Sequence, residues 1–252
     1  MSQRATFACT ALLGTNKVGE LKKTDDGYYI VVLGALDVFN SAGAYYPYDS
    51  AKDVFKESSS LMRRVANGAL RGEYGHPKRQ PNQSLREFVD RVLQIDEKNV
   101  AFHVRKVTVD FTSVKGEDGR PVIALIGEIK PAGPYAHVLE KQLENPSENV
   151  CFSIRSLTDD TFVAGKLYKH IRTVVTWDYV NEPGISVATK WKSPALEGLG
   201  TEVMIDRTIL ESIGTESCGV SFEDNGGVSP ASIVHDFSWN KTKTRLPGSA
   251  QW

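Results

Sequence analysis

The stretch Gly72-Glu73-Tyr74-Gly75-His76-Pro77 is the most informative part of this sequence, together with Val150-Cys151-Phe152-Ser153-Ile154-Arg155 further along. A histidine framed by glycine and proline precedes a serine in a β-rich segment by 77 residues, and Asp178 follows that serine after another 25. A serine hydroxyl becomes a good nucleophile only when a base takes its proton, and the base works best when a third group orients it. His76, Ser153 and Asp178 are therefore a candidate base, nucleophile and orienting group. Their chain order differs from the three common serine-hydrolase orders.

The residues beside these candidates carry further expectations. Pro77 restricts His76 to an extended backbone and has no N–H group, so we expect the imidazole to project from a stiff segment. We expect Arg155 to pair with a carboxylate or to line the site, and a solvated surface arginine is the alternative. Cys151 shares a strand face with Ser153, and its apolar surroundings favour a buried thiol over a nucleophile.

Each candidate also has a purely structural interpretation. A histidine before a proline is commonly a turn residue, serine is common on strands, and Asp178 could face water at a strand end. The nucleophile pattern Gly-x-Ser-x-Gly is absent around Ser153. His170 is a second choice for the third member, although its spacing from the serine is short. The joint order and spacing of the three residues is what favours a catalytic set.

Composition limits the classes of protein. A chain of 252 residues can bury a sizeable core, and its net charge of −1, from 30 basic and 31 acidic residues, does not indicate nucleic-acid binding. The three cysteines and five histidines lack metal-ligand spacing, so we expect no metal and no cofactor. No apolar run is long enough to cross a bilayer, and the mildly apolar stretch 5–14 lacks a secretory cleavage site. We therefore expect a cytoplasmic protein without membrane contacts.

Strand signals dominate, with a few helical segments between them. β-branched and aromatic runs predict strands at 28–33, 100–112, 122–129, 149–156 and 163–185. Helical spacing of apolar residues predicts helices at 53–69, 82–90 and 135–145, the second with a capping box formed by Ser84 and Glu87. The pattern predicts a mainly β fold with peripheral helices, of the α+β class, as one domain over residues 1–190. Residues 191–252 mix glycine, serine and acidic residues and are expected to be an appended C-terminal extension.

These motifs resemble those of the prohead maturation proteases of tailed bacteriophages, which share a fold with the herpesvirus assemblins. The matching segments are Gly72–Pro77, Phe152–Arg155 and Trp177–Val180, in the same order of elements over roughly residues 25–190. The resemblance implies a closed or partly closed assemblin-like β-barrel. It also implies a serine endopeptidase with Ser153 as nucleophile and His76 as general base. Asp178 would orient His76, at the position where the assemblins keep a second histidine.

The same resemblance implies a biological role. Such an enzyme cleaves scaffold and major capsid proteins inside the viral procapsid, in the host cytoplasm, with a preference for cutting after glutamate. It also implies self-processing, for which Glu197 and Glu216 are candidate sites whose cleavage would remove the C-terminal segment, and self-association as a dimer or larger assembly. Two alternatives stay open: a catalytically silent procapsid or scaffold component that uses the barrel for assembly contacts, and a β-barrel hydrolase acting on a small ester.

Overall fold

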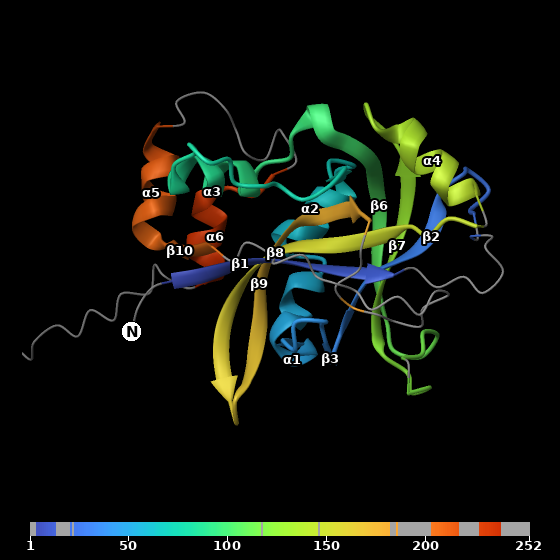
Figure 1. The fold of residues 1–252 in the computed structure, drawn as a ribbon, viewed down its shortest axis with the longest axis horizontal. Helices are drawn as coiled ribbons and strands as arrows, with labels where there is room; N and C mark the ends of the chain where they lie inside the picture. The colour runs from blue at the N-terminus through green and yellow to red at the C-terminus, as the bar shows by residue number, and fades with distance from the viewer. Residues whose placement is uncertain are drawn as a thin grey trace, which may run out of the picture.

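The structure, a computed structural model, describes residues 4–13, 21, 23–116, 118–145, 147–181, 185, 203–216 and 227–237. These residues form two β-sheets with helices around them (Figure 1). The larger sheet has the strand order β10-β1-β8-β9-β4-β3, and the smaller has the order β2-β7-β6-β5. None of the described helices is long and apolar enough to span a membrane.

The elements have the following bounds. The strands are β1 (Arg4–Leu13), β2 (Tyr29–Leu36), β3 (Val38–Phe39), β4 (Tyr45–Tyr46), β5 (Arg71–Glu73), β6 (Val100–Asp110), β7 (Ile123–Pro131), β8 (Cys151–Val163), β9 (Lys166–Val180) and β10 (Val203–Asp206). The α-helices are α1 (Tyr48–Ala51), α2 (Ser60–Ala66), α3 (Leu85–Leu93), α4 (Ala136–Glu144), α5 (Arg207–Glu216) and α6 (Pro230–Asp236). Two short 3₁₀ helices cover Lys52–Phe55 and Glu97–Asn99.

The expected mainly β fold with peripheral helices is confirmed, but a closed barrel is not found among the described residues. The two sheets have separate hydrogen-bond ladders. They approach each other where the end of β5 meets β9, through an isolated parallel bridge between Tyr74 and Tyr179. The assemblin-like barrel is therefore unconfirmed, and the observed architecture is a pair of sheets in contact at this corner.

Most of the predicted elements form, with local signals that explain where they begin. Ser84 caps α3 by accepting a hydrogen bond from the Glu87 backbone N–H, and the Glu87 carboxylate accepts from the Ser84 N–H in return. Ser59 caps α2 through a single bond, in which its side-chain oxygen accepts from the Met62 N–H. Strand β1 was not predicted. It lies inside the larger sheet, between β10 and β8.

Two clusters of buried apolar side chains hold the fold together. The first fills the space between the two sheets and includes Phe102, Phe152 and Trp177, all almost fully buried. The second lies between helices α3, α5 and α6 and the strands β8 and β9, and includes Phe88, Leu157, Val175, Leu210 and Ile233. Each such side chain contributes about 1.5–3 kcal/mol through removal from water.

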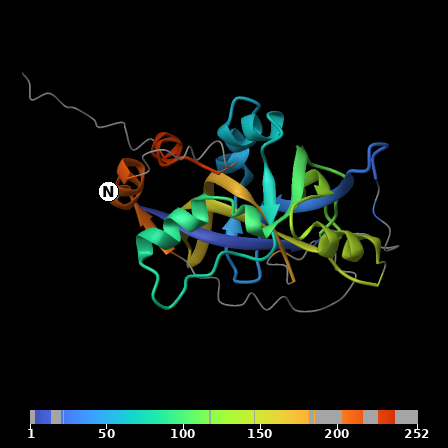
Figure 2. The same ribbon diagram turned by 90° about the horizontal axis from the view of Figure 1, so that it is seen from above.

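The C-terminal elements are part of this packing. Strand β10 pairs antiparallel with β1, and α5 and α6 supply a large part of the second apolar cluster. Figures 1 and 2 both show α5 and α6 together at one end of the molecule and α4 at the other. Residues 203–216 and 227–237 of the predicted C-terminal extension therefore pack directly against the strands of the N-terminal 190 residues.

Candidate active site

Strand register brings two of the three candidate residues together. Ser153 on β8 is the antiparallel partner of Asp178 on β9. Residues directly opposite each other in an antiparallel pair place their side chains on the same face of the sheet, with Cβ atoms about 4.5–5.5 Å apart. Strand β1 flanks β8 on its other side, with Ala11 opposite Ser153. The serine is therefore held in the interior of the larger sheet and beside the aspartate.

The third candidate comes from the smaller sheet. Strand β5 ends at Glu73, and Gly75 then adopts a φ of 74°, a left-handed conformation that favours glycine. The Gly75 N–H donates to the Tyr179 carbonyl oxygen at 2.7 Å, which fixes the turn against β9. His76 follows immediately, and its Nδ1 lies 3.0 Å from Asp178 Oδ2. The corner where the sheets meet thus joins the candidate base to its orienting carboxylate.

Exposure differs sharply within the set. Ser153 and Asp178 are fully buried, whereas 27% of the His76 side chain is exposed. Ser153 Oγ has no hydrogen-bond partner in the part of the chain that the structure describes. Ser156 Oγ, three residues further along β8, is in the same state. The lack of a partner is therefore not specific to the candidate nucleophile; its position opposite Asp178 is what distinguishes it.

A buried ion-pair network surrounds the aspartate. The Arg155 guanidinium binds Asp178 through both carboxylate oxygens, with Nε–Oδ2 at 3.0 Å and Nη2–Oδ1 at 2.5 Å. Its Nη1 also binds Glu73 Oε1 at 3.1 Å, and Arg155 and Glu73 are both fully buried. Glu73 in turn accepts from Arg91 of α3, with Nη1–Oε1 at 3.0 Å, and from the Asp96 N–H at 2.9 Å. Arg155 therefore pairs with carboxylates, the first of the two roles expected for it.

The network sets the protonation state of Asp178. Burial alone would raise the pKa of its carboxyl, but the Arg155 charge and the hydrogen bond with His76 outweigh that effect and hold the pKa below its ordinary value. Asp178 is therefore ionised at neutral pH. An ionised acceptor at Nδ1 favours the imidazole tautomer whose proton lies on Nδ1 and leaves Nε2 as the basic nitrogen.

Sequence reasoning missed Glu73 and Arg91 as parts of this site. Glu73 lies within the quoted motif, three residues before His76, but no spacing in the sequence connects it to Arg155, 82 residues away. A glutamate in a run that ends a strand would ordinarily be assigned to the surface. The charge of Glu73 is the one signal in the sequence. Glu73 lies two residues before a glycine turn and beside apolar residues, and a glutamate that is buried in such a place needs a cation next to it.

The remaining sequence candidates lie elsewhere. His170 lies opposite Asp159 in the register of the β8–β9 hairpin, and its Nε2 lies 2.8 Å from Thr161 Oγ1. It is eight residues along β9 from Asp178, which corresponds to about 26 Å of strand. Cys151 is buried, as expected, and its Sγ lies 3.6 Å from the Asn181 carbonyl oxygen. Among the described residues no group of three histidine, cysteine or carboxylate side chains is arranged to hold a metal. Glu216 is the last residue of α5, and Glu197 lies outside the described residues.

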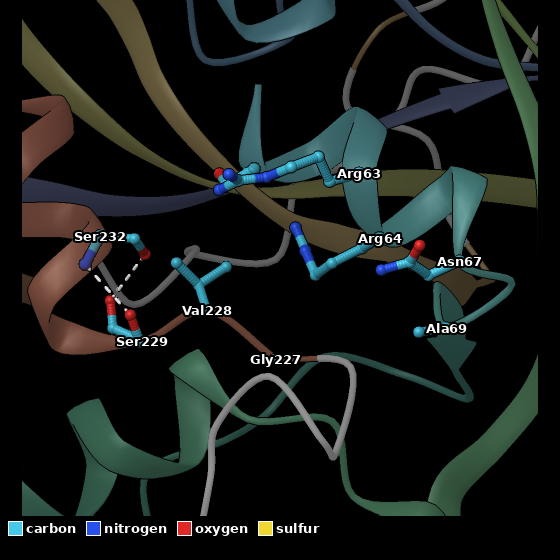
Figure 3. Close-up of a pocket in the computed structure, with 9 residues that line it drawn as sticks. Arg63, Arg64, Asn67, Ala69, Gly227, Val228, Ser229 and Ser232 are labelled. Carbon is cyan, nitrogen blue, oxygen red and sulfur yellow. Dashed lines mark hydrogen bonds between the residues drawn. The ribbon is translucent and has the colours of Figure 1, made fainter. Parts of the chain in front are cut away.

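Two cavities among the described residues lie away from this site. One of about 250 Å³ lies between α2 and the start of α6, and Figure 3 shows Arg63, Arg64, Asn67, Ser229 and Ser232 around it. The Arg64 guanidinium donates to the carbonyl oxygens of Val174 and Val175, both at 2.6 Å, so it ties α2 to β9. A neighbouring cavity of about 450 Å³ shares Ser60 with the first. Neither is lined by His76, Ser153 or Asp178.

Comparison with known proteins identifies the family. The model of the peptidase S80 family matches residues 7–230. The chain belongs to the peptidase S80 family. This S80 peptidase is 41% identical over 248 residues to the capsid maturation protease of Pseudomonas phage phiKZ, a match that covers 94% of this chain and 90% of the relative. The resemblance to phage maturation proteases indicated by the sequence motifs is therefore confirmed.

A solved structure is also similar to this S80 peptidase. The capsid assembly protease of bacteriophage T4 matches with a TM-score of 0.49 and 13% sequence identity, over 72% of this chain and 99% of the other. The family match begins within β1 and ends at the start of α6, so it includes His76, Ser153 and Asp178.

Proposed function

We propose that this S80 peptidase is a serine endopeptidase of phage capsid maturation, with a triad of His76, Ser153 and Asp178. The observation that carries the proposal is the 3.0 Å contact between His76 Nδ1 and Asp178 Oδ2, made directly beside Ser153 in the strand register. A base held by a buried, ionised carboxylate next to a serine is the arrangement that serine nucleophiles require.

The chemistry follows from the roles of the three groups. His76 Nε2 takes the proton of Ser153 Oγ as that oxygen attacks the carbonyl carbon of the scissile peptide bond. The resulting imidazolium donates the proton to the leaving amine, and an acyl-enzyme remains on Ser153. Water then enters, and His76 accepts a proton from it as the water oxygen attacks the acyl carbon. The bond from that carbon to Ser153 Oγ breaks, the imidazolium returns its proton to Oγ, and the second product leaves as a carboxylic acid. Asp178 stays ionised throughout and stabilises the imidazolium, consistent with its lowered pKa.

The differences in exposure suggest how substrate reaches the site. His76 is the member of the triad that reaches the surface, and Tyr74, two residues before it, is 39% exposed. The Tyr74 ring stacks on Tyr135 with centroids 4.8 Å apart and contacts Tyr179 at 5.3 Å. We place the substrate on this side. Binding must open the sheet corner enough for the Ser153 hydroxyl to meet both His76 and the substrate, because the serine is fully buried.

The substrates are proposed from the family and from the named phage relative. They are scaffold and major capsid proteins inside the procapsid, which are cut after glutamate, and the enzyme itself. The enzyme acts as a dimer or larger assembly.

For self-cleavage, a cut after Glu216 and a cut after Glu197 would have different consequences. A cut after Glu216 leaves β10 and α5 in place and releases α6, whereas a cut after Glu197 separates both helices and β10 from the chain that precedes them. Because β10 pairs with β1, we favour Glu216 as the cut that leaves the larger sheet intact.

The test is intact-mass spectrometry of the purified chain, incubated at high concentration, with two matched variants. Ser153→Ala removes the proposed nucleophile. Ser156→Ala is the control, because Ser156 is also a fully buried β8 serine whose Oγ has no partner among the described residues. We expect truncation after a glutamate in the wild type and in Ser156→Ala, and none in Ser153→Ala.

A fluorophosphonate, which reacts with activated serines, supplies a second readout that needs no substrate. Labelling that is lost in Ser153→Ala and retained in Ser156→Ala supports the triad. Equal truncation of both variants, with equal labelling, would refute it. A wild-type chain that neither labels nor cleaves added capsid and scaffold protein would favour the silent assembly component.

A further inference from the structure

Beyond the three candidate residues, a chain of buried charges runs away from His76 through four elements. It passes from His76 in the turn after β5 to Asp178 on β9, then to Arg155 on β8, back to Glu73 on β5 and out to Arg91 on α3. Three consecutive members, Asp178, Arg155 and Glu73, are fully buried. The side chain of Arg91 is 25% exposed and forms the outer end.

The position of Arg155 creates an electrostatic difficulty for a triad. A guanidinium bound to both oxygens of Asp178 cancels much of the negative charge that would stabilise a protonated His76. A carboxylate can raise the basicity of an imidazole only to the extent that its own charge is not already compensated. If Arg155 were the only charge beside Asp178, the net charge of the pair would be close to zero, and the pair would do little to stabilise a protonated imidazole.

Glu73 restores the missing negative charge. It binds the guanidinium on the edge that Asp178 leaves open, through Arg155 Nη1, while Arg155 Nη1 also donates to the Gln94 carbonyl oxygen at 3.0 Å. Glu73 itself is held by Arg91 and by the Asp96 N–H. It is therefore fixed in place as the second carboxylate of the buried group and lies on the same short segment as His76.

We propose that Glu73 is a positioning residue of the active site, which acts through Arg155 to set the basicity of His76 and to hold Asp178 in the orientation that binds Nδ1. Arg91 opposes it from the outer end of the network. The inference rests on the proposed triad and deepens it. It predicts that the two ends of the network move the titration of His76 in opposite directions, although neither touches the imidazole in any described contact.

The sign follows from the charges that face the network. These are Asp178 and Glu73 as anions, Arg155 and Arg91 as cations, and His76 as the titrating group. Glu73→Gln removes one negative charge, which disfavours imidazolium and lowers the pH at which His76 titrates. Arg91→Gln removes one positive charge and raises that pH. For a buried unit charge roughly 10 Å away the shift is about one pH unit, and it is smaller for the partly exposed Arg91.

Histidine NMR on the full-length chain measures this directly. The chain has five histidines, and the signal of His76 is assigned by its absence in His76→Asn. The titration midpoint of that signal is compared in the wild type, Glu73→Gln, Arg91→Gln and the double variant. We expect a downward shift of about one unit, an upward shift of about half a unit, and a return toward the wild type in the double variant. The pH dependence of fluorophosphonate labelling at Ser153 should shift in the same directions.

Each outcome decides the matter. Opposite shifts of the His76 titration midpoint in the two single variants support the proposal. Shifts of the same sign, or shifts of less than about 0.2 units in both variants, overturn it. A purely structural network would lower thermal stability without shifting that midpoint in opposite directions. If Glu73→Gln does not fold, the sign of the Arg91→Gln shift decides alone. A wild-type chain in which Ser153 does not react with the probe would contradict the proposed triad, while the NMR titration would still show whether the network controls His76.

Discussion

Gly72 is the position where one added methyl group should separate the two halves of the candidate site. A Cβ at this residue would lie 2.0 Å from Phe102 Cζ and 2.4 Å from the Trp177 carbonyl oxygen. Ordinary contact needs about 3.5 Å, so in Gly72→Ala strand β5 must move away from β9 by about 1 Å. Trp177 directly precedes Asp178, and His76 follows β5 after only two residues. The same movement therefore pulls the imidazole away from its carboxylate.

The magnitude has two parts. Overpacking of this kind costs about 1–3 kcal/mol, and the upper end applies because one of the atoms met is backbone. For a chain of this size that corresponds to a drop in Tm of roughly 5–12 °C. A displacement of about 1 Å between base and orienting group reduces reactivity by about 10²-fold. Gly72→Ala should thus lose more reactivity than its fraction unfolded explains.

The assay combines thermal unfolding with the rate of fluorophosphonate labelling at a temperature where all variants are folded. Gly127→Ala on β7 is the matched control, because its added Cβ would lie 2.3 Å from the Leu33 side chain but away from the β5–β9 corner. We expect Gly127→Ala to lose stability and to keep its labelling rate. A Gly72→Ala variant with wild-type Tm and wild-type labelling would refute the argument, since it would show that β5 does not lie against β9 as described.

Three further predictions concern stability. Arg64→Ala should lower the free energy of unfolding, measured with denaturant, by about 2–4 kcal/mol, because it leaves two buried carbonyl oxygens of β9 without their donors. Arg63→Ala, at the exposed neighbouring residue, should stay within about 0.5 kcal/mol of the wild type. Ser84→Ala should cost about 1 kcal/mol through loss of the α3 cap, measured in the same experiment; no change would mean that the cap contributes nothing. Although burial alone would raise the pKa of Asp178, the Arg155 charge and the His76 hydrogen bond hold it below its ordinary value. The ionised carboxylate therefore stabilises the fold fully above the pKa of an unfolded aspartate, and this stabilisation is lost as the pH falls through the lower pKa of the folded state. Asp178→Asn should flatten the dependence of Tm on pH in the acid range below about 4, and an unchanged slope would contradict this.

The elements that the sequence predicted well are those with local signals. The capping box at Ser84 and Glu87 forms, and the strands at 100–110 and 123–131 lie where β-branched residues indicated them. Strand β1 was not predicted from the sequence, because two threonines dilute its apolar pattern and its partner strands lie far along the chain. Its place between β8 and β10 depends on residues that no window of local sequence contains.

The candidate site shows the same division. Motif order pointed to His76 and Asp178, and the structure brings them into contact; the catalytic roles of the three residues remain a prediction. The ion-pair network could not be predicted from the sequence, because its members lie on four different elements: Glu73, Arg91, Arg155 and Asp178. Whether a glutamate is buried beside an arginine depends on how two sheets and a helix pack, and charge alone favours the surface.

The place of β1 in the larger sheet has a consequence for how the enzyme is made. The strand that carries Ser153 needs β1, 142 residues earlier at its register partner Ala11, and β1 in turn pairs with β10, where Arg4 lies opposite Asp206. Such distant pairings give a high contact order and form slowly. During synthesis, the residues up to Asp206 must leave the ribosome before this sheet can be completed. A nascent chain that already contains His76 and Ser153 therefore lacks the finished sheet around Ser153, and the topology delays activity until β10 has been made.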